Sequence, residues 1–89
     1  MLTTNVLKYP IFSHVIGLYA NNNGEITDVS FMKSLKKLNA HNIFFINVSF
    51  MSSLKQLDAS SNYGINQNGI QGLELYELNT DDNKKIINV

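Results

Sequence analysis

The 89-residue sequence contains no Cys, no Trp and no Arg, and only one Pro. Without Cys the chain has no disulfide bonds, no thiolate metal ligands and no cysteine nucleophile. Seven acidic residues balance seven Lys residues, so the formal net charge is +0. This balance argues against nucleic-acid binding through a broad basic surface, because such binding depends on neutralising phosphates. No apolar run approaches the roughly 20 residues that a membrane span needs, so we expect no membrane partner.

The composition is that of one small globular domain, at 44% hydrophobic and 16% charged residues. Residues 1–10 lack the basic segment and apolar core of a secretory signal, which favours an intracellular protein. Asn, Ile and Lys supply 29 of the 89 residues. Because their codons are rich in A and T, this bias indicates an A/T-rich genome rather than a chemistry.

Two segments of the chain nearly copy each other. Residues 29–40 read VSFMKSLKKLNA and residues 48–59 read VSFMSSLKQLDA, with nine of twelve positions identical. The shared core, an apolar residue followed by x-x-Leu-x-Ala/Thr, occurs four times. The four copies, repeats 1 to 4, begin at Val15, Leu35, Leu54 and Leu75. Their spacing is close to one period of about 20 residues, which is typical of repeat proteins whose units stack on one another.

This pattern resembles the leucine-rich repeat family, whose repeats read L-x-x-L-x-L-x-x-N-x-L. The resemblance covers residues 15–89, and residues 26–35 (ITDVSFMKSL) are most similar to the internalin type. Residues 1–14 are then a degraded half-repeat or cap, with Val6, Tyr9 and Phe12 in register. The resemblance implies an α/β solenoid of about four coils. It also implies a short parallel sheet on the concave face and irregular or 3₁₀ turns on the convex face.

Local patterning predicts the same elements. Apolar and polar residues alternate over residues 38–40, as expected for a strand with one buried face. An amphipathic helix over residues 30–39 is the competing interpretation, but strict threefold spacing drifts around a helix. We therefore expect a turn near residues 30–35 and then a strand of three or four residues. Stacking would make adjacent rungs of Leu18, Leu38, Leu57 and Leu78.

Asn recurs after the strand pattern, at Asn23, Asn62 and Asn83, with Asn42 one place early in repeat 2. A buried Asn amide can both donate to and accept from backbone groups. We expect these residues to bond the next coil rather than a ligand. The glycine-punctuated segment 63–72 lacks the Lys and the strand-then-helix context of a phosphate loop, so its glycines are predicted to relieve backbone bends.

Strand side chains that miss the core are expected on the concave face, where they form a polar surface. A polar surface is needed for solubility alone, but a rigid polar array also suits binding of a protein or extended peptide. Tyr19 is the expected anchor, because exposed aromatics are favoured hot spots. The resemblance likewise implies concave-face binding. The predicted partner-binding residues are Tyr19, Asn21, Lys37, Asn39, His41, Gln56, Asp58, Ser60, Glu77, Asn79 and Asp81.

Catalytic groups are scarce. The only histidines are His14 and His41. Ser13 adjoins His14, but neighbours on a strand point to opposite faces and would not form a nucleophile–base pair. Asp58 with Asp81 and Asp82 offers too few ligands for a calcium site. We expect no enzyme, no cofactor and no metal.

The sequence stops in mid-repeat, and no polar segment follows the apolar row of Leu75, Leu78 and Ile86. Solenoids normally need a cap at such an edge. Three explanations stay open: a fragment of a longer repeat protein, end-to-end pairing with another copy, or residues 86–89 folding over the edge. The alternative to a binding module is thus a structural or truncated fragment that stacks and has no ligand of its own.

Overall fold

A computed structural model describes residues 2–43, 46–48, 51–61 and 64–86. The ladder residue Asn62 and the final segment 87–89, on which two of the expectations above fall, lie outside the described residues. Within the described residues, no helix is long and apolar enough to cross a membrane.

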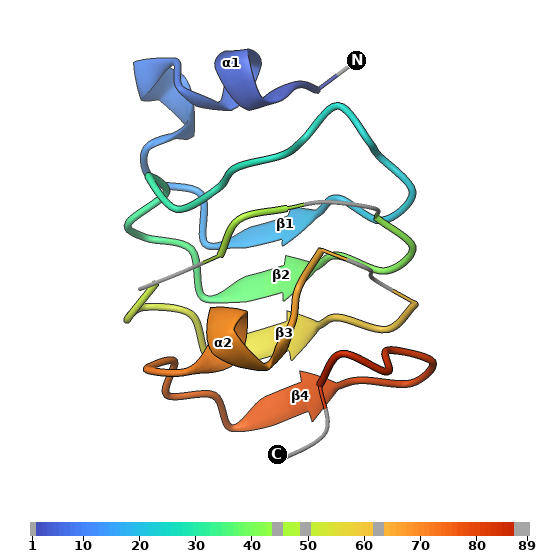
Figure 1. Cartoon of the computed structure of the whole chain (residues 1–89). Coiled ribbons are helices and arrows are strands. Elements are labelled where there is room, and N and C mark those ends of the chain that lie inside the picture. The colour runs from blue at the N-terminus through green and yellow to red at the C-terminus, as the bar shows by residue number, and fades with distance from the viewer. Residues whose placement is uncertain (1, 44–45, 49–50, 62–63, 87–89) are drawn as a thin grey trace.

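The described part of the chain is a small α/β structure built around four parallel strands (Figure 1). Two helical turns come first, α1 (Thr4–Leu7) and the 3₁₀ helix η1 (Pro10–Phe12), and a third, α2 (Gln67–Ile70), lies between the last two strands. The strands pair in sequence order and are β1 (Gly17–Tyr19), β2 (Lys37–Asn39), β3 (Gln56–Asp58) and β4 (Glu77–Asn79).

The central residue of each strand is a leucine, and the four leucines are in register. Leu18 pairs with Leu38, Leu38 with Leu57, and Leu57 with Leu78. This confirms the prediction that they form adjacent rungs. Residues 30–31 and 33–34 form turns before β2, so the turn-then-strand interpretation is correct and the helix over residues 30–39 is absent. Strict threefold spacing therefore reflects two tight turns rather than a helical face.

The chain leaves every strand through a left-handed residue, which a ladder bond precedes in the first three repeats. The amides of Ala20, Ala40 and Ala59 donate to the carbonyl at the end of the following strand, at 2.8–2.9 Å. Two residues later the backbone has positive φ in every repeat, at Asn22, Asn42, Ser61 and Asp82. Non-glycine residues seldom adopt this conformation, and Asn and Asp tolerate it best. The chain thus turns away from the sheet at the same place four times.

This recurrence corrects the assignment of repeat 2. Asn42 was read as a ladder Asn displaced by one residue, but it is the counterpart of the left-handed Asn22, to whose Oδ1 it donates at 2.8 Å. The ladder position of repeat 2 is held by Ile43, which is 1% exposed. An aliphatic side chain there packs into the core instead of bonding the backbone.

The ladder role of Asn23 and Asn83 is confirmed, with one correction. Asn83 is buried, and its Nδ2 donates to the carbonyls of Ala59 and Ile65 at 2.9 and 3.1 Å. Asn23 donates likewise to the carbonyl of Leu2 at 3.1 Å. These acceptors precede the Asn by about one repeat, so the bonds reach back to the preceding unit and not to the next one. The carbonyls available at that bend belong to the preceding unit.

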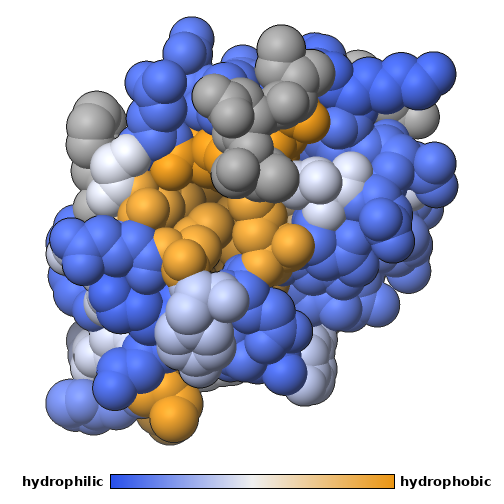
Figure 2. Space-filling model, turned by 90° about the horizontal axis from the view of Figure 1, so that it is seen from below, coloured by the Kyte–Doolittle hydropathy of each residue, from blue (hydrophilic) through white to orange (hydrophobic). Residues whose placement is uncertain are grey.

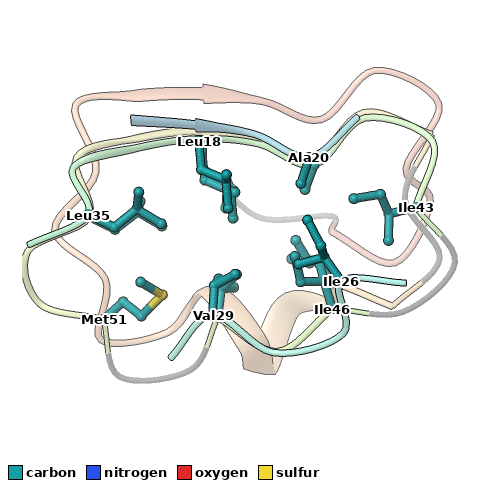
Figure 3. Close-up of a cluster of buried hydrophobic side chains, with 14 of the residues drawn as sticks. Leu18, Ala20, Ile26, Val29, Leu35, Ile43, Ile46 and Met51 are labelled. Carbon is teal, nitrogen blue, oxygen red and sulfur yellow. The ribbon is translucent and has the colours of Figure 1, made fainter. Parts of the chain in front are cut away.

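The core lies between the sheet and the returning chain (Figure 3). Leu18 and Ala20 point inward from the strand side. They face Val29 and Ile26, which point inward from the opposite side. The inner rows are closed to solvent: Leu35, Leu38, Leu54 and Leu57 are 0–2% exposed. The alanines that follow the strands in repeats 1 to 3, Ala20, Ala40 and Ala59, are fully buried.

The N-terminal segment packs against the core through its two helical turns. Leu7 of α1 is 3% exposed, and Leu2 and Phe12 pack against the same core. Tyr9, which was expected in the apolar register, is instead 62% exposed. Thr3 caps α1 by accepting the amide of Val6 at 3.2 Å, which favours a helical turn there.

The glycine-punctuated segment contains a helical turn that the sequence did not predict. Asn66 accepts the amide of Gly69 at 2.9 Å and so caps α2. Gly72 has φ +83 and follows α2, where its left-handed conformation provides the expected bend.

Leu57→Ala should lower the free energy of unfolding by about 2–5 kcal/mol, because it leaves a cavity in a closed row. The matched change Leu78→Ala should cost less, since Leu78 is only half-buried. Urea unfolding of both variants measures the difference. Equal losses would contradict the account of the core.

Asn83→Ala should lower the free energy of unfolding by about 1–3 kcal/mol, because two buried carbonyls lose their donor. Asn23→Ala, at a half-buried position with one such bond, is the control and should cost less. Thermal unfolding compares the two variants. A larger loss of unfolding free energy in Asn23→Ala than in Asn83→Ala would contradict the prediction.

Candidate functional site

An open hollow of about 490 Å³ lies over the outward face of the sheet. Eight of the eleven predicted partner-binding residues line it, and they come from all four strands or their ends. They are Tyr19, Asn21, Lys37, Asn39, Gln56, Asp58, Glu77 and Asn79. We call these eight residues the polar sheet face. Seven of them flank the inward-pointing leucine of their strand, and Asn21 lies two residues after the end of β1. They gather because neighbours on a strand alternate between faces.

Tyr19 and Lys37 form one end of the polar sheet face. The ring of Tyr19 is 69% exposed, and Nζ of Lys37 lies 5.7 Å from its centroid, within the range of a cation–π contact. Gly17, which pairs with Lys37, has no side chain, and nothing lies within 4 Å of the space a Cβ would take.

Gln56 and Glu77 form the opposite end. They are paired across β3 and β4, and Nε2 of Gln56 donates to Oε2 of Glu77 at 2.9 Å. Glu77 remains exposed. The polar sheet face therefore runs from an aromatic, cationic end at β1 and β2 to an anionic end at β4.

The residue that ends each of β2, β3 and β4 has a structural task as well. Oδ1 of Asn39, Asp58 and Asn79 accepts the amide of the residue two places on, at 2.9–3.0 Å. These bonds fix the turn that leads into the left-handed residue. The sequence carried this signal, since Asn or Asp stands at the same place in three repeats. The Oδ1 atom of each of these side chains therefore accepts a hydrogen bond that stabilises the turn.

His41, Ser60 and Asp81 do not line the hollow. Ser60 is only 6% exposed, and its hydroxyl donates to Oδ1 of Asp58. Nδ1 of His41 lies 2.9 Å from the same hydroxyl oxygen. Because the single hydroxyl proton goes to the carboxylate, His41 is the donor to Ser60. His41, Ser60 and Asp58 form a network that joins repeats 2 and 3 beside the hollow.

This direction of donation differs from that of a nucleophile–base pair, in which the imidazole accepts the hydroxyl proton. Ser13 and His14 lie in a turn and not in a strand, so the strand argument made for them does not apply. Across the described part of the chain, no three His, Asp or Glu side chains form a group that could hold a metal ion.

Comparisons of the chain with protein-family models, with curated proteins and with solved structures find no match. The candidate site therefore rests on the geometry of this chain.

Neutral His41 should carry its proton on Nδ1, because Ser60 has no proton left to offer the ring. Long-range ¹H–¹⁵N NMR distinguishes the two tautomers. Ser60→Ala removes the acceptor and should shift the population toward Nε2–H, while Asp81→Ala, outside the network, should leave it unchanged. A wild-type ring protonated on Nε2 would contradict the assigned network.

Proposed function

We propose that the chain is a short solenoid of the leucine-rich repeat type and that it binds an extended protein segment across its polar sheet face. Four repeats at a nearly constant spacing support the first part, together with the in-register leucines. The left-handed residue that recurs in each repeat supports it as well.

The observation that carries the second part is the hollow itself, lined by residues of all four strands and carrying a largely exposed tyrosine. A large aromatic exposed on a rigid element is the usual centre of a binding surface. Sheet hydrogen bonds and the bonds of Asn39, Asp58 and Asn79 fix the backbone beneath it. Binding then costs little ordering entropy, because the surface is formed in advance.

The charges of the face favour one orientation of the partner. An acidic group would lie beside Lys37 near β1 and β2, and a basic group beside Glu77 at β4. Apolar or aromatic side chains of the partner would pack on the ring of Tyr19. The role proposed is recognition without catalysis, since the one imidazole near the face donates to its hydroxyl neighbour.

A random 12-residue peptide library displayed on phage, selected against the chain, tests this proposal. Selected peptides should lose at least about tenfold in affinity on Tyr19→Ser or Lys37→Ser, the loss expected for a hot-spot residue. Tyr76→Ser is the matched control, because Tyr76 is 74% exposed but lies outside the hollow.

Enriched peptides should also carry an excess of acidic residues on one side and basic residues on the other. The proposal fails if no peptide is enriched, or if binding follows Tyr76 and ignores Tyr19 and Lys37.

A further inference from the structure

The C-terminal end of the sheet exposes an apolar surface. Leu75 and Leu78 are half-buried, whereas their counterparts in repeat 3, Leu54 and Leu57, are 0% and 2% exposed. They line a second hollow of about 420 Å³ with Ile70, Leu73 and Tyr76, and we call these five residues the C-terminal end face. Figure 2 looks onto this end and shows apolar atoms in a depression within a polar rim.

The residue before each strand distinguishes the ends of the molecule from its middle. In the inner repeats it is Lys36 or Lys55, which keeps that position solvated. In the outer repeats it is Ile16 or Tyr76, which are 63% and 74% exposed. Single exposed apolar residues are common on surfaces, but here the substitution of Lys by an apolar residue occurs at both ends and only there.

The opposite end of the molecule has exposed apolar residues of its own. Tyr9, Ile11 and Ile16 are 62%, 82% and 63% exposed, and we call them the N-terminal end face. They flank or belong to η1 or directly precede β1, at the far end of the sheet from β4 (Figure 1).

Charge decides which end faces are compatible. Four of the seven acidic residues lie between residues 74 and 82, against two lysines at Lys84 and Lys85. Residues 1–24 contain no acidic residue and one lysine, Lys8. The next residue, Glu25, is exposed and its carbonyl accepts the amide of Thr4, so the N-terminal end carries one acid. Two C-terminal ends brought together would oppose four carboxylates on each side, whereas a C-terminal end meets one acid on an N-terminal end.

We propose that the C-terminal end face of one copy docks on the N-terminal end face of a second copy, head to tail. Leu75, Leu78 and Tyr76 of the first copy would then pack against Ile11 and Ile16 of the second. Such a contact leaves one face free at each end, so it does not close and can extend into a row of copies. The hollows at the polar sheet face and at the C-terminal end face share one lining residue, Glu77, and the contact would place the sheet faces of successive copies side by side.

Sedimentation equilibrium of the full chain, over concentrations up to about 1 mM, tests the contact. The wild type should show a weight-average mass that rises with concentration. Tyr76→Lys, which installs the inner-repeat residue, and Ile11→Lys should each stay monomeric. Both positions are largely exposed, so the variants should keep the wild-type circular dichroism. Ser52→Lys, which adds the same charge at an exposed position between β2 and β3, is the control and should associate as the wild type does.

An equimolar mixture of Tyr76→Lys and Ile11→Lys provides the sharpest result. Each variant keeps one intact end face, so the mixture should form a dimer and nothing larger. A wild type that remains monomeric would overturn the proposal. Self-association of Ile11→Lys at the wild-type level would also overturn it, because two C-terminal end faces would then meet. Self-association of Tyr76→Lys would overturn it as well.

Discussion

The in-register packing of one leucine per repeat is the constraint on which the rest of the structure depends. Leu18, Leu38, Leu57 and Leu78 point into one row only if every strand pairs with the next without a slip. A shift of one residue would turn each leucine to the solvent face and bury its polar neighbours. The nearly constant repeat length returns the chain to the same rung each time. The small variation in length is absorbed between the strands, where α2 adds its turn before β4.

The outward face of the sheet follows from the same alternation. The residues on either side of each buried leucine point outward, so substitutions at these positions do not disturb the core. Yet Asn39, Asp58 and Asn79 also hold the turns that end their strands. By contrast, Tyr19 with Lys37 and Gln56 with Glu77 contact each other through their side chains. A partner could engage these pairs without weakening a backbone turn, which is why the proposed binding centres on them.

Periodicity allowed the sheet, its register and most of the polar face to be predicted from the sequence, because each depends on spacing alone. The N-terminal segment could not be predicted in this way, because its repeat pattern is degraded and the cap formed by Thr3 favours a helical turn. α2 was missed because its signal is a single capping Asn66 within a glycine-rich segment. Ser60 was placed on the face by its spacing, but its bond to Asp58 draws it below the surface. The spacing of the repeat predicts the position of a residue along its strand, whereas its hydrogen-bond partners determine the orientation of a short polar side chain.

Methyl NOEs in solution NMR test the central claim most directly. The account predicts cross-peaks between the methyl groups of Leu18 and Leu38, of Leu38 and Leu57, and of Leu57 and Leu78, since paired residues of adjacent strands lie about 5 Å apart. It also predicts none between Leu18 and Leu78, which two strands separate. Amide contacts typical of a helix over residues 30–39, in place of these leucine contacts, would contradict it.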